Sequence, residues 1–172
     1  PQLVSTANDP RSPSPLARVA AEFDALATTF DEYPIAAAAN VALFENEARD
    51  MSPGVVLDLG CGTGRTLAAL APYSKELWGV DVSPVILYSA HRGLHSNNSV
   101  RLICDDVSTV QLPDSHFDLI VSHTTLHHLP LDGVERTLQS VARALKPRGR
   151  AVLVDIISQG LMAWNAPLAR RL

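Results

Sequence analysis

Three glycines follow a short apolar segment in residues 55–64, which read Val-Val-Leu-Asp-Leu-Gly-Cys-Gly-Thr-Gly. A short β-branched, apolar run of this kind predicts a buried strand. Gly60, Gly62 and Gly64 allow a tight turn in which the backbone approaches a ligand without Cβ clashes. A helix that begins near Arg65 would point its free N–H groups at the same ligand. The segment therefore predicts a ligand-binding loop between a strand and a helix.

The spacing of the glycines separates this loop from two other kinds of binding loop. The dinucleotide pattern Gly-x-Gly-x-x-Gly would need a glycine where the chain has Arg65, and a phosphate-binding P-loop would need a lysine after Gly64. Asp58 lies within the strand, where a buried carboxylate requires hydrogen-bond donors or a ligand's ammonium group. An ordinary tight turn without a ligand is the alternative.

As a whole, residues 57–64 resemble the first motif of the class I S-adenosylmethionine-dependent methyltransferases, and the resemblance extends over residues 16–157. It implies an α/β fold with a doubly wound, mainly parallel, Rossmann-like sheet that binds S-adenosylmethionine and releases S-adenosylhomocysteine. It also implies that the backbone from Gly60 to Gly64, with Cys61 among the glycines, binds the carboxylate of the amino-acid tail. Asp58 would meet the ammonium group, either directly or through the loop backbone or a water.

Two further acidic positions are candidates for the nucleoside part of the cofactor. Asp81 ends the next predicted strand, and a carboxylate about 20 residues after the glycine loop can accept both ribose hydroxyls. Val82 would then border the adenine. The alternative is that Asp81 only complements the N-terminal dipole of the following helix.

The resemblance places the adenine-contacting acid on Asp106 in the segment Asp105-Asp106-Val107. The Asp106 carboxylate would accept the adenine amino group, and the Val107 N–H would donate to a ring nitrogen. Adjacent carboxylates repel, so one of the two is expected to face solvent. A solvated acidic turn without a ligand is the alternative.

Polar residues also follow the fourth predicted strand. Ser122 and His123 end it, and the resemblance implies that they face the methionine part of the cofactor. Of the next pair, His127 and His128, the resemblance singles out His128, which could serve as a general base or orient the loop. A structural hydrogen-bonding role, the commoner one for a histidine near a turn, is the alternative. Tyr33 is expected either in a cover over the site, touching substrate, or in the core. The histidines have no acidic or cysteine partner at metal-binding spacing, so no metal is predicted.

The elements that must position these residues alternate along the chain. Strands are predicted at residues 55–59, 76–81, 100–104, 117–122 and 150–157, and helices at 16–30, 35–49, 84–93 and 131–145. This alternation implies right-handed crossovers and a parallel, doubly wound sheet. Ligands in such sheets bind beyond the carboxyl ends of the strands. The candidate residues lie at those ends, and Asp155 borders the site from the fifth strand.

The predicted organisation is a flexible arm at residues 1–15, an N-terminal helical lid at 16–50 and an S-adenosylmethionine-binding core at 51–172. The family sheet usually closes with two more strands that form an antiparallel pair. No alternating segments for strands six and seven are evident after Ile157. This is the pattern expected of a core truncated at its C-terminus.

Composition excludes several classes of partner. Hydrophobic residues make up 47% and charged residues 19% of the 172 residues, which is ordinary globular composition, and the net charge is −4. This acidic balance gives no general attraction for nucleic acid, so no nucleic-acid partner is predicted; a local basic patch is the alternative. No apolar run has the length of a membrane span, and no secretory signal precedes the first helix. With two cysteines expected to be reduced, a cytoplasmic protein is predicted.

The resulting hypothesis is an enzyme that transfers a methyl group from S-adenosylmethionine to an oxygen, nitrogen or carbon nucleophile of a small molecule. Because the sulfonium already activates the methyl carbon, the protein would contribute proximity, alignment and water exclusion. One alternative is a methyltransferase-like partner subunit that binds the cofactor and is catalytically silent. Another is a nicotinamide-dependent oxidoreductase on a similar sheet. The sequence does not specify an oligomeric state.

Overall fold

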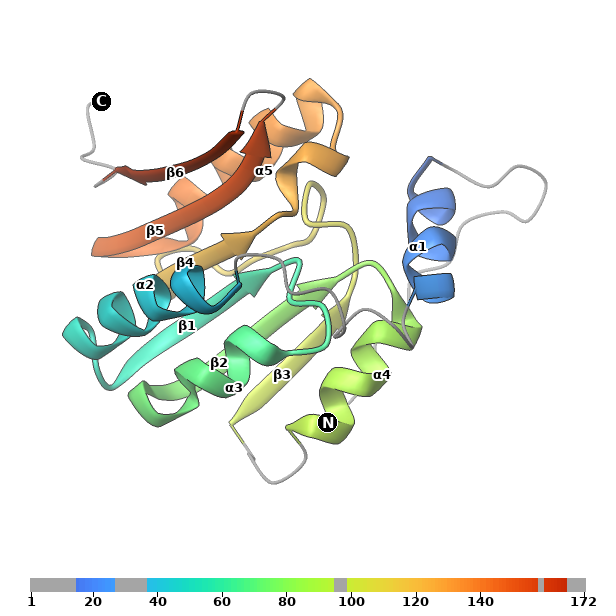
Figure 1. Cartoon of the computed structure of the whole chain (residues 1–172). Helices are drawn as coiled ribbons and strands as arrows, with labels where there is room; N and C mark the ends of the chain where they lie inside the picture. Colours follow the sequence, from blue (N-terminus) through green and yellow to red (C-terminus); the bar gives the residue numbers. More distant parts are fainter. Residues whose placement is uncertain (1–14, 27–36, 95–98, 158–159, 167–172) are drawn as a thin grey trace.

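The computed structural model describes residues 15–26, 37–94, 99–157 and 160–166. These ranges build one six-stranded sheet of order β3-β2-β1-β4-β5-β6 (Figure 1). Its strands are β1 Gly54–Leu59, β2 Ser74–Asp81, β3 Val100–Cys104, β4 Phe117–His123, β5 Leu145–Ile157 and β6 Gly160–Ala166. The first five pair in parallel, and β6 runs antiparallel to β5. The predicted doubly wound, mainly parallel α/β sheet is confirmed.

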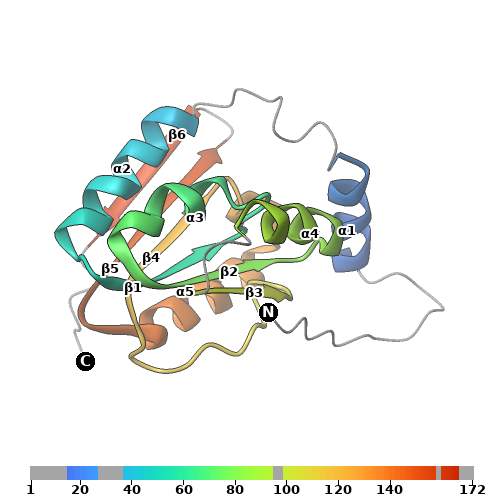
Figure 2. The same ribbon diagram turned by 90° about the horizontal axis from the view of Figure 1, so that it is seen from below.

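Helices cover both faces of the sheet, with α2, α3 and α4 on one side and α5 on the other (Figure 2). The helices are α1 Pro15–Leu26, α2 Ala37–Asp50, α3 Arg65–Leu70, α4 Pro84–Gly93 and α5 Leu131–Ala144, with short 3-10 turns η2 at Ala71–Tyr73 and η3 at Leu126–His128. Fully buried Phe44 and Leu67 fill the core under the first group, and Val141 and Phe117 fill it under α5. Among the described residues, no helix is both long and apolar enough to cross a bilayer.

Local signals in the sequence account for most of the element boundaries. β3 has the predicted bounds, and α4 begins at Pro84 with Ser83 as its N-cap. The Ser83 hydroxyl accepts a hydrogen bond from the Ile86 N–H at 3.1 Å, which satisfies one of the free donors of the first helical turn. α3, predicted from Arg65, is a single short stretch of 6 residues.

The C-terminal part of the sheet differs from the prediction in two places. β5 begins at Leu145, which pairs with Phe117, and regular pairing resumes only where Arg150 meets Leu119. Residues 146–149, which lie between the predicted helix at 131–145 and the predicted strand at 150–157, are therefore an irregular part of the strand, in which Arg148 has a left-handed φ of 72°. No separate turn lies between α5 and β5, because the chain passes directly from the last helical residue into extended backbone.

No sixth strand was expected after Ile157, and this prediction was wrong. Residues 160–166 form β6, with Gly160 opposite Ile157 and Ala166 opposite Ala151. The segment Gly-Leu-Met-Ala-Trp-Asn-Ala lacks strict alternation of apolar and polar residues. It pairs nonetheless because backbone hydrogen bonds to a neighbouring edge strand do not depend on that pattern. The described part of the chain contains no seventh strand.

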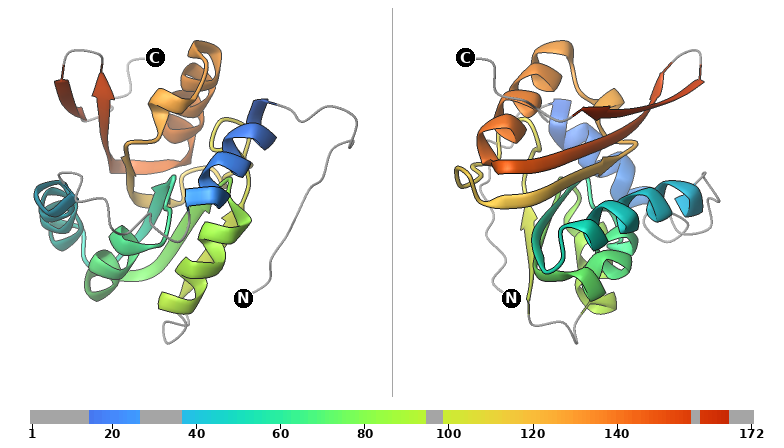
Figure 3. Two further views of the ribbon diagram at one scale, coloured as in Figure 1. Left: turned by 45° about the vertical axis from the view of Figure 1, so that its right-hand side comes forward. Right: turned by 90° about the vertical axis from the view of Figure 1, so that its left-hand side faces the viewer.

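The two N-terminal helices occupy different places. α2 is part of the layer on the sheet, where Phe44 and Ala48 are almost completely buried. α1 instead lies beside α4, close to the end of the sheet where the site residues gather (Figure 3). The predicted arm, apart from Pro15, and the segment that holds Tyr33 lie outside the described residues.

Candidate cofactor-binding and active site

A cavity of about 310 Å³ opens at the carboxyl ends of β1, β2, β3 and β4. Many of the residues singled out from the sequence line it: Gly60, Cys61, Gly62, Asp81, Val82, Asp106, Val107, His123 and His128. They come from four separate strand ends, which a parallel sheet places along one edge. The predicted location of the site therefore coincides with a real cavity.

The glycine-rich loop needs its glycines for conformation and for space. Gly60, Gly62 and Gly64 have φ angles of 75°, 53° and 82°, in the left-handed region that favours glycine. The backbone N–H groups of Gly60 and Cys61 both donate to the Val80 carbonyl, at 2.8 and 3.0 Å. These bonds hold the loop against β2 and leave its glycine backbone along the cavity wall, which is the cradle that a bulky ligand requires.

Asp81 joins the loop to the start of α4. One carboxylate oxygen accepts the Gly62 N–H at 2.9 Å, and the other accepts the Ser83 N–H at 3.0 Å. Burial raises the pKa of Asp81, and the backbone hydrogen bonds from Ser83, Gly62 and Val82 oppose that rise. Each oxygen keeps a further lone pair, so Asp81 can organise the loop and still accept hydroxyl groups from the cavity.

Three of the predicted cofactor residues lie behind the cavity wall. Asp58 and Ser122 are 2% and 1% exposed, and neither lines the cavity. The Ser122 hydroxyl donates to the Leu59 carbonyl at 2.8 Å, which ties β4 to β1. Gly64 faces α4, where an added Cβ would lie 2.9 Å from Leu94 Cδ1. None of these three residues contributes to the described cavity wall.

Burial, with a smaller effect of nearby Asp81, raises the pKa of Asp58 to about 8. The folded state therefore binds a proton that the unfolded state releases near pH 4, so this group makes stability fall as pH rises from about 4 to about 8. We expect Asp58→Asn to be more stable than the wild type at pH 8 by about 2–5 kcal/mol, with the difference vanishing toward pH 4. Denaturant unfolding of both proteins across this range measures it. A constant difference between them would contradict the buried, protonated carboxyl group.

The acidic pair after β3 contributes both members, Asp105 and Asp106, to the cavity, whereas one of them was expected to face solvent. One Asp105 oxygen accepts the Asp106 N–H at 2.8 Å, and one Asp106 oxygen accepts the Ser108 N–H at 2.8 Å. The repulsion between the carboxylates is offset because each accepts a backbone donor. The turn therefore holds both groups at the wall, next to buried Val107.

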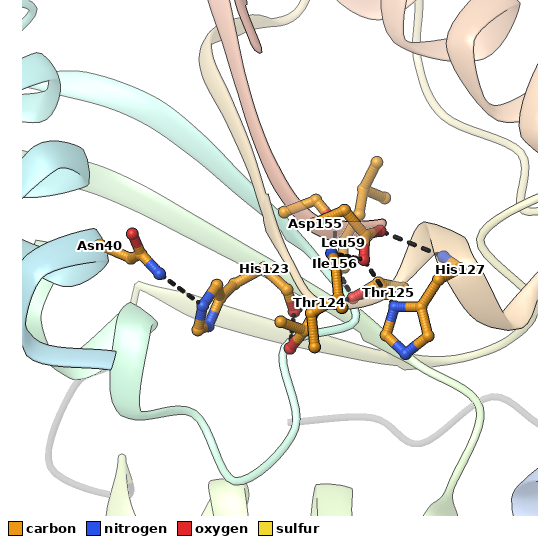
Figure 4. A network of polar contacts seen from close by, with 9 residues as sticks. Asn40, Leu59, His123, Thr124, Thr125, His127, Asp155 and Ile156 are labelled. Atoms are coloured by element: carbon orange, nitrogen blue, oxygen red, sulfur yellow. Dashed lines mark hydrogen bonds and ion pairs between the residues drawn. The ribbon is translucent and has the colours of Figure 1, made fainter. Parts of the chain in front are cut away.

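His123 is held from the side of the helical layer. The Asn40 side-chain amide, from α2, donates to His123 Nε2 at 2.9 Å (Figure 4). The Phe44 ring contacts the imidazole edge-on, with 6.3 Å between the ring centroids. Burial and the charge of Arg65 lower the pKa of His123. Because Nε2 accepts, the neutral ring carries its proton on Nδ1.

His128 lines the cavity from η3. Its ring contacts the Phe23 ring edge-on at 5.1 Å and the His127 ring at 3.8 Å between centroids. Burial and, to a smaller extent, the adjacent His127 lower the pKa of His128. A neutral imidazole can accept a proton, which a protonated one cannot. His127 does not line the cavity and instead binds Asp155 (Figure 4).

The sequence reasoning missed several lining residues. Thr124 and Thr125 directly follow His123, and their place at a strand end is the signal that could have found them. Thr124 has a left-handed φ of 52° and donates its N–H to the Val154 carbonyl at 2.8 Å. The other lining residues that were missed are Thr63, Arg65, Thr66, Ile86 and Leu129 in the α/β part of the chain, and Val19, Phe23 and Leu26 on α1. The α1 residues reach the cavity only through tertiary packing.

Hydrogen bonds also hold α1 against the N-terminus of α4. The Ser83 hydroxyl donates a hydrogen bond to the Asp24 carboxylate. The same carboxylate accepts the Val85 N–H at 3.4 Å, at the N-terminus of α4. With Phe23 against His128, α1 bridges the cavity from α4 to η3.

Comparison with known proteins agrees with this geometry. Residues 56–149, more than half of the chain, match the family model described as "Methyltransferase domain". An uncharacterized methyltransferase, YcgJ of Bacillus subtilis, is 31% identical over 130 residues, which cover 73% of this chain and 49% of the relative. The phosphoethanolamine N-methyltransferase of Plasmodium falciparum is 28% identical over 111 residues, covering 64% of this chain and 42% of that protein.

Solved structures show the same likeness. The crystal structure of YcgJ superposes with a TM-score of 0.61 at 32% identity, covering 67% of this chain and 49% of that chain. A DhpI–SAM–HEP complex superposes with a TM-score of 0.67 at 27% identity, covering 80% of this chain and 64% of that chain. The chain spans about half the length of the curated relatives it matches. By its fold, its glycine-rich loop and these matches, the chain belongs to the methyltransferase-domain family, in the class I, S-adenosylmethionine-dependent group.

Proposed function

We propose that this chain binds S-adenosylmethionine in the 310 Å³ cavity and transfers its methyl group to an oxygen, nitrogen or carbon nucleophile of a small molecule. The observation that carries the proposal is convergence. A glycine loop, two acidic strand ends and a neutral histidine meet at one cavity on the sheet of a methyltransferase family. The glycine backbone at the wall fits a ligand that must approach the chain closely.

The wall offers a suitable partner for each part of the cofactor. The Gly60–Gly64 backbone would bind the amino-acid tail, with the Asp58 carboxyl group supporting the loop from behind. Asp81 would accept the ribose hydroxyls, and Asp106 would accept the adenine amino group. The apolar groups that flank the adenine would be Val82 and Val107, and His123 would face the methionine part.

The chain's own residues would prepare the transfer. When bound, S-adenosylmethionine supplies a methyl group that its positively charged sulfur activates. In the transfer, the lone pair of the acceptor would take up that methyl group, and sulfur would keep the electrons of the bond that it loses. A neutral His128 at the wall can take the proton that the acceptor loses. Phe23 and the other apolar residues of α1 would cover the reacting groups and exclude water.

The cover proposed here is α1 rather than the whole predicted segment 16–50, because α2 packs on the sheet. A small acceptor is supported by the net charge of −4, which gives no attraction for nucleic acid, and by the substrate in the name of the phosphoethanolamine N-methyltransferase. The free thiols of Cys61 and Cys104 support a cytoplasmic location.

The test begins with calorimetry of S-adenosylhomocysteine and NADH binding to the wild type. We expect the first to bind and the second not to bind, and the reverse would overturn the proposal. Incubation with S-adenosylmethionine and a panel of small alcohols, phenols, amines and carbon acids should then yield S-adenosylhomocysteine. His128→Asn should lower this turnover by about 100-fold while leaving the affinity for S-adenosylhomocysteine unchanged. Binding without turnover across the panel would favour the silent partner subunit.

A further inference from the structure

A single carboxylate ties η3 to the end of β5. Asp155 accepts two hydrogen bonds from His127, one from the backbone N–H at 3.1 Å and one from ring atom Nδ1 at 2.5 Å (Figure 4). The Ile156 N–H donates to the same carboxylate at 2.7 Å. Three contacts fix the carboxylate, and two of them fix both the backbone and the ring of His127.

The His127 ring, which Asp155 holds in place, packs against the ring of His128. The two imidazoles lie with their centroids 3.8 Å apart and their planes tilted by 42°. On α1, Phe23 meets the His128 ring at an angle of 88°. The His128 N–H donates to the Thr125 carbonyl at 3.2 Å, which holds the backbone of the turn. The imidazole that reaches the cavity is therefore enclosed by groups that are themselves anchored.

We propose that Asp155 and His127 are positioning residues for His128: Asp155 holds His127, and His127 holds the His128 imidazole at the cavity wall. Neither Asp155 nor His127 lines the cavity, so both act through His128. The proposal assigns a role to two residues outside the cavity wall, and it rests on the proposed function because His128 is the base there.

The charges around His128 agree with this arrangement. The groups that face it are His127 from η3, Asp155 from β5 and Glu22 from α1. Burial and His127 lower the pKa of His128, whereas the carboxylates of Asp155 and Glu22 raise it, and the lowering effects dominate. The neighbour that fixes the ring in space thus also favours its neutral, proton-accepting form.

Two substitutions distinguish the effect on the position of the His128 ring from the effect on its pKa. His127→Asn keeps a side-chain N–H that can reach Asp155 but removes the imidazole ring. Asp155→Ala removes the acceptor and frees the turn. Asp132→Ala, which removes an exposed carboxylate that pairs with Arg136 on α5, is the matched control.

The measurement is a proton NMR titration of the histidine rings in wild type and variants, with the His128 signal assigned by its loss in His128→Asn. In His127→Asn, the His128 pKa should rise. In Asp155→Ala, the His128 signal should lose the ring-current shifts caused by His127 and Phe23. The Asp132→Ala titration should match the wild type. Should Asp155→Ala prove unfolded by circular dichroism, Asp155→Asn replaces it, with the same loss expected in smaller amount.

Unchanged His128 shifts and titration in both the His127 and the Asp155 variants would overturn the positioning role. Affinity for S-adenosylhomocysteine, measured on the same samples, should stay within a factor of about two of the wild type, because neither residue lines the cavity. Failure of the wild type to bind S-adenosylhomocysteine would instead overturn the proposed function, whatever the titrations show. The two failures are therefore distinguishable.

Discussion

Gly60→Ala should abolish measurable binding of S-adenosylhomocysteine and destabilise the fold by about 2–4 kcal/mol. Gly60 has a φ of 75°, which an alanine adopts only with strain. Its added Cβ would lie 2.0 Å from Oγ1 and 2.6 Å from Cγ2 of Thr125. Thr125 cannot easily withdraw, because Oγ1 donates to the carbonyl of Leu59 or of His123, each at 3.2 Å. The clash must therefore displace the loop that forms the cavity wall.

The matched control for this substitution is Gly93→Ala at the end of α4. A Cβ added there would meet nothing within 4 Å, so binding and stability should stay near those of the wild type. Calorimetry with S-adenosylhomocysteine and thermal unfolding report the two effects separately. Wild-type affinity in Gly60→Ala would mean that binding of S-adenosylhomocysteine does not depend on this loop.

Asp81→Ala should weaken binding of S-adenosylhomocysteine by about 1–3 kcal/mol, which is a loss of about 5- to 150-fold in affinity. The substitution removes the acceptors for the proposed ribose hydroxyls. It also leaves the N–H groups of Gly62 and Ser83 without the carboxylate that now holds them at 2.9 and 3.0 Å. Both losses act on the same wall of the cavity.

Asp81→Asn distinguishes the two contributions, because its amide oxygen can still accept one of these bonds. We expect it to bind with an affinity between those of the wild type and Asp81→Ala. Glu76→Gln, on the same strand but away from the cavity, is the control, and its affinity should be unchanged. If titration calorimetry finds equal affinities for Asp81→Ala and the wild type, Asp81 has no part in the site.

The sequence alone was enough for the α/β alternation, the β3 and α4 boundaries and the place of the site. β1 is an uninterrupted buried strand, and Ser83 and Pro84 start α4 by local hydrogen bonding and ring geometry. Such signals act over a few neighbouring residues, so they can be read without the fold. The glycine spacing is equally local, because it reports the left-handed φ angles of one turn.

Which side chains reach the cavity was harder to foresee. Asp58 and Ser122 were expected at the ligand and lie behind the wall. One of Asp105 and Asp106 was expected in solvent, yet both line the cavity. The direction of a side chain at a strand end depends on the local turn and on the strands beside it. Sequence spacing places the residue at the right end of the sheet but does not set that direction.

Only the tertiary structure decided the contacts between segments far apart in the chain. Asp24 reaches the N-terminus of α4, Asn40 reaches His123, Asp155 reaches His127, and β6 pairs along β5. The sequence around each of these residues contains no pattern from which its partner could be predicted. Their partners follow from how helices and strands pack, because long-range contacts are selected by the shape and hydrogen bonding of the whole fold rather than by neighbours in sequence.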